Sequence, residues 1–189
     1  MSAVQAWTSV GLPRSQLVLG VPGYGHSFFV NESVALTDQG EMVAYPPFEP
    51  EQPRGDSADD PPAVDICGAT TGWGGVFNFW GLVESKFLDE SGQPFLGIYY
   101  RYDECSQTVR FMYNLSSSAV GLTKDMHAID QPYVYNATSQ VMVSFDNARS
   151  LEAKGEFIKN YGLGGYAMWE AASDYHDILI DSIREGGGY

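Results

Sequence analysis

The chain has 189 residues, of which 44% are apolar and 18% charged, an ordinary balance for a globular protein with a sizeable core. Its 24 acidic and 10 basic residues give a formal net charge of −14, which argues against nucleic acid or an anionic membrane as a partner. No apolar run approaches the roughly 20 residues of a transmembrane helix, and no secretory leader follows Met1.

The amino-terminal segment predicts a short helix and then a buried strand. Val4 and Trp7 are spaced for one helix face, and Gly11 with Pro13 would end that helix. The run QLVLGVPGYG that follows (16–25) is apolar without alternation. Such a run is typical of a strand that is covered on both faces, as in a parallel sheet.

The middle of the chain changes character and holds most of the ten prolines and the acidic loop EPEQPRGDSADDPP. Strand-like aromatic runs occur at 95–103 and 140–146, and one short helix is predicted at 78–88. We interpret this region as a small α+β module inserted between two segments of another fold.

A helix, a strand and a second helix are predicted after the module. Asp146 or Asn147 can cap the first helix, in which Phe157 and Tyr161 share one face and which Gly162 would end.

The strand YAMWE (166–170) comes next, followed by a helix over 175–185 that Ser173 or Asp174 would cap. The order strand, insertion, helix, strand, helix is typical of the last part of a (β/α) barrel. The predicted division is a barrel segment at 1–29, the α+β module at 30–143 and a second barrel segment at 144–189.

Two stretches resemble one family. LVLGVPGYGHSF (17–28) is similar to the seventh-strand signature Gly-x-Pro-x-Tyr-Gly-Arg-x-Phe of glycoside hydrolase family 18, the chitinases. The stretch 143–175 resembles that family's closing segment, in which a Ser-Phe-Asp helix start leads to Gly-Gly-x-x-x-Trp-Glu. The resemblance, nearest to fungal members, implies the carboxyl-terminal portion of a (β/α)8 TIM barrel, strands seven and eight, with an α+β insertion.

The resemblance also implies a ligand and a site. The family acts outside the cell on chitin, a polymer of β-1,4-linked N-acetylglucosamine, and needs no cofactor. Trp169 matches the strand-end tryptophan that forms the floor under the sugar at the cleavage point. An indole offers a flat surface for the apolar face of a sugar ring. The alternative is that Trp169 simply packs in the barrel core.

Other matched positions are expected at the barrel mouth. Tyr24 is predicted to bind substrate, whereas Phe28 fits either the mouth or the core. His26 stands where the family usually has arginine, which removes a fixed fork of donors. Glu170 and Asp174 are interpreted as structural, a strand-end acid and a helix cap.

The catalytic acid of the family is missing from these residues. Family members use substrate assistance, with a glutamic acid in an Asp-x-x-Asp-x-Asp-x-Glu motif as the proton donor. The 189 residues hold no such motif, so no catalytic residue is assigned and no hydrolysis by this chain alone is expected. The alternatives are a non-catalytic, lectin-like chitin-binding module and a pseudogene product that does not fold stably.

Cysteines and sequons point mildly to the secretory route. Cys67 and Cys105 are the only cysteines and could form one disulfide, whereas a metal site is not expected because the three histidines are scattered. Glycosylation sequons begin at Asn31, Asn114 and Asn136, and the first and last are retained as predicted sites.

Residues 109–131 lack the family's pattern and interrupt the passage from ECSQT to PYVYN. The segment has 23 residues, which 69 nucleotides would encode, an intact-frame length suited to a short intron. One hypothesis is a translated, unspliced intron, in which case the Asn114 sequon means nothing. The other is an ordinary variable surface loop. Genomic sequence without splice-site bases at both edges would exclude the intron.

Overall fold

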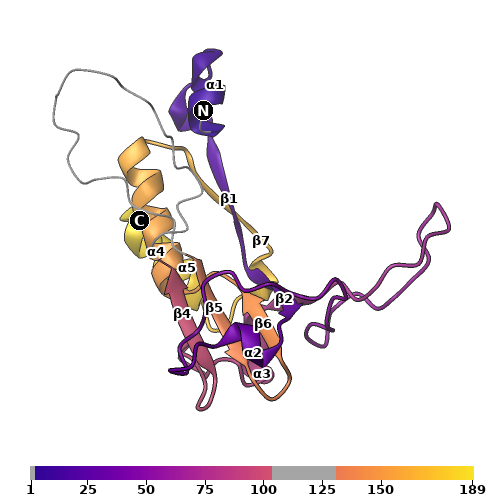
Figure 1. The fold of residues 1–189 in the computed structure, drawn as a ribbon. Coiled ribbons are helices and arrows are strands. Elements are labelled where there is room, and N and C mark those ends of the chain that lie inside the picture. Colours follow the sequence, from indigo (N-terminus) through magenta and orange to yellow (C-terminus); the bar gives the residue numbers. More distant parts are fainter. Residues whose placement is uncertain (1–2, 104–130) are drawn as a thin grey trace, which may run out of the picture.

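The computed structural model describes residues 3–103 and 131–189, and within them it shows two β-sheets that differ in type. β1 and β7 form a two-stranded parallel sheet, and five antiparallel strands in the order β3-β2-β6-β5-β4 form the other (Figure 1). The strands are β1 (Val18–Pro22), β2 (Tyr24–Phe29), β3 (Val76–Asn78), β4 (Tyr99–Asp103), β5 (Gln131–Asn136), β6 (Val141–Ser144) and β7 (Gly165–Trp169).

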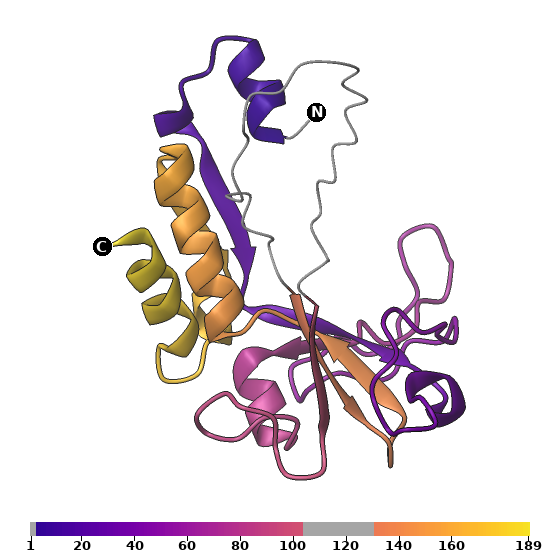
Figure 2. The same cartoon turned by 60° about the vertical axis from the view of Figure 1, so that its left-hand side comes forward.

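Helices accompany both sheets. They are α1 (Ala3–Ser9), α2 (Glu32–Ala35), α3 (Phe79–Glu84), α4 (Ala148–Tyr161) and α5 (Ile178–Gly187), with short 3₁₀ turns η1 (Arg14–Gln16) and η2 (Ala171–Ser173). Figure 2 shows α4 and α5 beside the parallel pair, with the five-stranded sheet below and to the right of them. In the described part of the chain no helix is long and apolar enough to cross a membrane.

The parallel sheet has one covered and one uncovered face. β1 and β7 pair from Val18 opposite Gly165 to Pro22 opposite Trp169, which agrees with the parallel sheet predicted for 16–25. Val21 packs in a core with α4 and α5, but Val18, on the opposite face of β1, is 57% exposed. The cover expected on both faces is therefore present on one only, because the described helices lie on a single side.

Local signals set the ends of α4 as predicted. The Asn147 side chain accepts a hydrogen bond from the Ser150 N–H, and the Ser150 hydroxyl accepts one from the Asn147 N–H, which forms a capping box. The rings of Phe157 and Tyr161 stack with their centroids 4.3 Å apart. Gly162 follows in the left-handed conformation, with φ of 64°.

The last helix begins three residues later than the sequence suggested. The Asp174 carboxylate accepts from the backbone N–H groups of Leu179 and Ile180, each at 3.0 Å, so the predicted capping role of Asp174 is confirmed. α5 then crosses α4 at very short range. A Cβ added at Gly155 would overlap the carbonyl oxygen of Ile183, so the two backbones come into contact there.

The antiparallel sheet begins before residue 30, the predicted start of the module. The sequence predicted that Pro22 and Gly23 end the first strand, and β1 does end at Pro22. After Gly23, β2 pairs with β3 and β6 instead of the parallel sheet. Alternation along β6 then divides the module into two cores. Val143 packs in the larger core with α4 and α5, and Met142 packs in a second core on the other face of the sheet.

β4 and β5 are joined by residues 104–130, which the structure does not describe. The strands pair from Tyr99 opposite Tyr135 to Asp103 opposite Gln131. Both ends of the connecting segment are therefore attached to directly opposed positions of one antiparallel pair. Gln131, the last residue of the predicted insert at 109–131, is the first residue of β5, and the rest of that insert lies outside the described residues.

Candidate functional site

Trp169 ends β7 and its side chain is 75% exposed. The two residues before it in the strand differ, since Met168 packs against the main core and Ala167 is exposed like the indole. Trp169 belongs to neither of the two described cores. The indole thus lies on the uncovered face, at the carboxyl end of a parallel strand, where (β/α) folds build their sites. Its peptide bond to Glu170 is cis.

Gly23 joins the end of this strand to the α+β module. Its N–H donates to the carbonyl oxygen of Trp169 at 2.9 Å, and its own carbonyl accepts from the N–H of Phe79 at 3.0 Å. A Cβ at position 23 would lie 2.9 Å from the Cβ of Ser173 and 3.0 Å from the Glu170 carbonyl oxygen. No larger residue fits without displacing the loop that follows Trp169.

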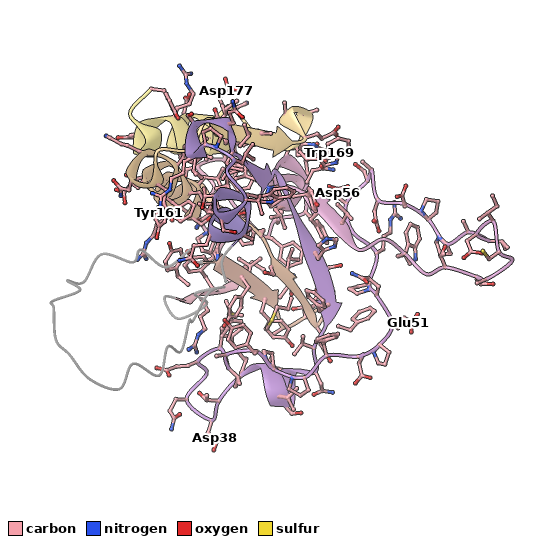
Figure 3. The ribbon with its side chains drawn as sticks, turned by 90° about the horizontal axis from the view of Figure 1, so that it is seen from above. Asp38, Glu51, Asp56, Tyr161, Trp169 and Asp177 are labelled. Carbon is pink, nitrogen blue, oxygen red and sulfur yellow. The ribbon has the colours of Figure 1, made fainter. Side chains whose placement is uncertain are left out.

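A buried chain of hydrogen bonds supports the same junction. The fully buried Ser173 donates its hydroxyl to Asn78 Oδ1 at 2.6 Å. Asn78 Nδ2 in turn donates to the Asp56 carboxylate at 3.0 Å, and the Asn78 backbone N–H donates to the same oxygen at 2.6 Å. Figure 3 shows Asp56 near the strand end that carries Trp169. The segments that contain Asp56, Asn78 and Ser173 are therefore held together beside the end of β7.

Tyr24, the other predicted binding residue, opens β2 directly after Gly23. It is partly buried, and its ring meets the ring of His26 edge to face, with centroids 5.5 Å apart. Farther along the same strand face, Phe28 packs on the second core and on Phe48, with ring centroids 4.9 Å apart. Of the two sequence alternatives for Phe28, the packing role is the one observed.

The remaining predicted site residues are dispersed over the surface. Cys67 is exposed, and Cys105 lies outside the described residues. Asn31 is exposed and accepts from the Ser33 N–H at 3.0 Å. Asn136 accepts from the Thr138 N–H at 3.0 Å. In the described residues no group of three His, Cys, Asp or Glu could hold a metal ion.

Sequence reasoning missed Asp56 as a member of the site. It occurs in the acidic, proline-rich loop, where a run of carboxylates indicates a solvated segment. Yet Asp56 and Asp59 are only 4% and 8% exposed, and their oxygens accept backbone N–H groups of the same loop. The sequence signal was the local pattern of aspartate near glycine, which favours side chain to backbone bonds.

Together the fold and the site define an α/β protein with parallel barrel-type strands and an exposed aromatic ring at a strand end. The family model of glycosyl hydrolases family 18 matches residues 1–174. The chain belongs to glycosyl hydrolase family 18, and with the solved structures of that family this implies a fold of the TIM-barrel type.

Individual relatives support the assignment to this family. The chain is 41% identical over 192 residues to a chitinase-like effector of Moniliophthora roreri and 44% identical over 190 residues to one of Moniliophthora perniciosa. It matches a Rhizomucor miehei chitinase structure with a TM-score of 0.69 and 26% identity, over 98% of this chain and 42% of that one. Each match covers all or nearly all of this chain. The chain spans 41% and 38% of the two effectors' lengths.

Proposed function

We propose that the chain is the carboxyl-terminal portion of a chitinase-type glycoside hydrolase domain and that it forms part of a cleft for β-1,4-linked N-acetylglucosamine polymers. In this proposal β1 and β7 are strands seven and eight of the barrel, and the module from β2 to β6 is the α+β insertion. The parent protein would act outside the cell, by the retaining, substrate-assisted mechanism of the family.

The observation that carries the proposal is the exposure of Trp169 at the carboxyl end of β7. An indole that is 75% exposed gains little stability from packing, whereas it can stack on the C–H face of a sugar ring. Tyr24 follows the glycine that binds the Trp169 carbonyl, which supports a place for it at the wall of the proposed cleft. The sequence holds no Asp-x-x-Asp-x-Asp-x-Glu motif, and hydrolysis would need a proton donor supplied by other polypeptide.

Binding to insoluble chitin and to chito-oligosaccharides tests the role of Trp169. Trp169→Ala should weaken binding by roughly tenfold, as expected for removal of a central aromatic contact. Trp7→Ala is the matched control, because Trp7 is 58% exposed on α1 and belongs to neither strand of the parallel sheet. Equal retention of the wild type and Trp169→Ala would remove Trp169 from the site.

A second function, that of a non-catalytic lectin-like module, is supported by the same missing motif. Both functions predict no sugar product when the chain is incubated with chito-oligosaccharides, and release of shorter oligomers would contradict both. The DNA upstream of Met1 separates them. An in-frame Asp-x-x-Asp-x-Asp-x-Glu sequence there would support the hydrolase, and an uninterrupted reading frame without it would support the lectin.

A further inference from the structure

A pocket of about 310 Å³ lies on the five-stranded sheet, on the face of the second core. This volume is at the lower end of the range for small-molecule sites, about 300–1,000 Å³. Its walls come from three neighbouring strands and from the loop after α2. The lining residues are Phe28, Val30, Tyr45, Pro46, Phe48, Tyr133, Met142 and Ser144.

The lining is aromatic and carries no charged side chain, although the whole chain has 24 acidic residues. Phe28 and Phe48 form one ring pair, with centroids 4.9 Å apart. Tyr45 and Tyr133 form another, with centroids 6.5 Å apart. The polar side-chain groups of the lining are the hydroxyls of the two tyrosines and of Ser144.

Tyr45, at the rim of the pocket, has an unusual backbone conformation. Tyr45 has φ of 52°, a left-handed backbone that is unusual for a bulky residue and that is enriched at ligand-binding positions. Its side chain is 69% exposed, and that of Phe48 is 61% exposed. Two large rings therefore stand at the edge of one pocket with most of their surface in water.

We propose that this pocket is a second ligand site, which takes a small uncharged aromatic ring carrying one or two polar groups, such as a phenol or an indole. Ring-on-ring contacts with the four aromatic side chains supply the attraction. A sugar fits less well, because its many hydroxyls would enter a pocket whose lining is mostly apolar and offers few polar groups.

The pocket lining contains neither Trp169 nor Tyr24. Tyr24 and Phe28 are four residues apart on β2, which corresponds to about 13 Å along a strand. The inference therefore does not depend on any role for Trp169, and the two can fail separately.

The test is a titration of the full 189-residue chain with p-cresol and, separately, with N-acetylglucosamine, followed by NMR. The reporter is the Cε methyl group of Met142, which lines the pocket and is 7% exposed. We expect p-cresol to shift this signal with a dissociation constant that is roughly millimolar or tighter. N-acetylglucosamine should leave it unchanged over the same range.

Two variants make the assignment specific. Phe48→Ala should weaken p-cresol binding by at least about fivefold. Leu96→Ala, which removes a side chain that is 95% exposed and not part of the lining, should bind like the wild type. An unmoved Met142 signal, or equal affinity of the two variants, would overturn the site. A stronger response to N-acetylglucosamine than to p-cresol would overturn the ligand class.

Discussion

Replacing Asp56 by alanine should destabilise the protein far more than the same change at Asp65, although both lie in one loop. Asp56 is 4% exposed and accepts from Ala58 N at 2.8 Å, Asn78 N at 2.6 Å and Asn78 Nδ2 at 3.0 Å. Asp65 is exposed and accepts from Cys67 N and Ala69 N, both at 2.8 Å.

The two losses of stability differ because the donors that bond Asp56 are shielded from water, whereas those that bond Asp65 can bond to water after the substitution. A hydrogen bond to a charged group contributes about 1.5–3 kcal/mol net, and a buried donor left without a partner costs about 1–3 kcal/mol. The Asp56 carboxylate also loses hydration on folding, which offsets part of that sum. We expect Asp56→Ala to lose about 3–5 kcal/mol of unfolding free energy. Asp65→Ala should lose about 1 kcal/mol or less, since water replaces its bonds.

Urea denaturation of both variants, followed by circular dichroism, measures the two losses. A loss of this size is a large part of the 5–15 kcal/mol typical of a domain. Asp56→Asn keeps one acceptor oxygen without the charge and should fall between Asp56→Ala and the wild type. If Asp56→Ala and Asp65→Ala unfold within about 1 kcal/mol of each other, the buried loop aspartate is not the support that the geometry indicates.

Partial burial raises the pKa of the Tyr100 phenol, and this effect exceeds that of the hydrogen bond from Asn147, which lowers it. The stability associated with this group should therefore be present below about pH 10 and be lost as pH rises through the raised pKa. Because burial also raises the pKa of Tyr135, ultraviolet titrations of the wild type and of Tyr100→Phe should differ by one late-ionising tyrosine, and equal late titration in both would contradict the assignment. Replacement of 104–130 by a two-residue Asn-Gly turn should leave β4 and β5 able to pair, because their ends are directly opposed, and loss of folding measured by circular dichroism would refute this. Expression in a glycosylating host should attach glycans at Asn31 and Asn136, which intact-mass measurement would detect, whereas an unmodified mass from the secreted protein would contradict both sites.

The barrel-type elements could be predicted because their signals are local. Asn147, Gly162 and Asp174 act through bonds to nearby backbone, so cap and stop residues place α4 and α5 within a few residues of the observed ends. The apolar run at 16–25 likewise predicted a parallel strand. Pro22 and Gly23 marked the end of that strand, where β1 does end, but nothing in the sequence indicated that 24–29 would join a second, antiparallel sheet.

Only single residues of the candidate site could be proposed from the sequence. Trp169 and Tyr24 follow from a motif, and their role in binding stays a prediction; Trp169 ends β7, and Tyr24 follows the glycine that donates to the Trp169 carbonyl. The bond between Ser173 and Asn78 spans 95 positions of sequence, and no local pattern encodes such a pairing. The aromatic pocket could not be predicted from the sequence for the same reason, since Tyr45 and Tyr133 meet only after the sheet is assembled.

The backbone contact between α4 and α5 at Gly155 bears on the order of folding. These helices and β7 are consecutive in sequence, so their contacts close short loops and can form early. The partner of β7 in the parallel sheet, β1, is separated from it in sequence by the whole module, so this pairing closes a much longer loop. The two helices can therefore pack on each other before the tryptophan receives its neighbouring strand.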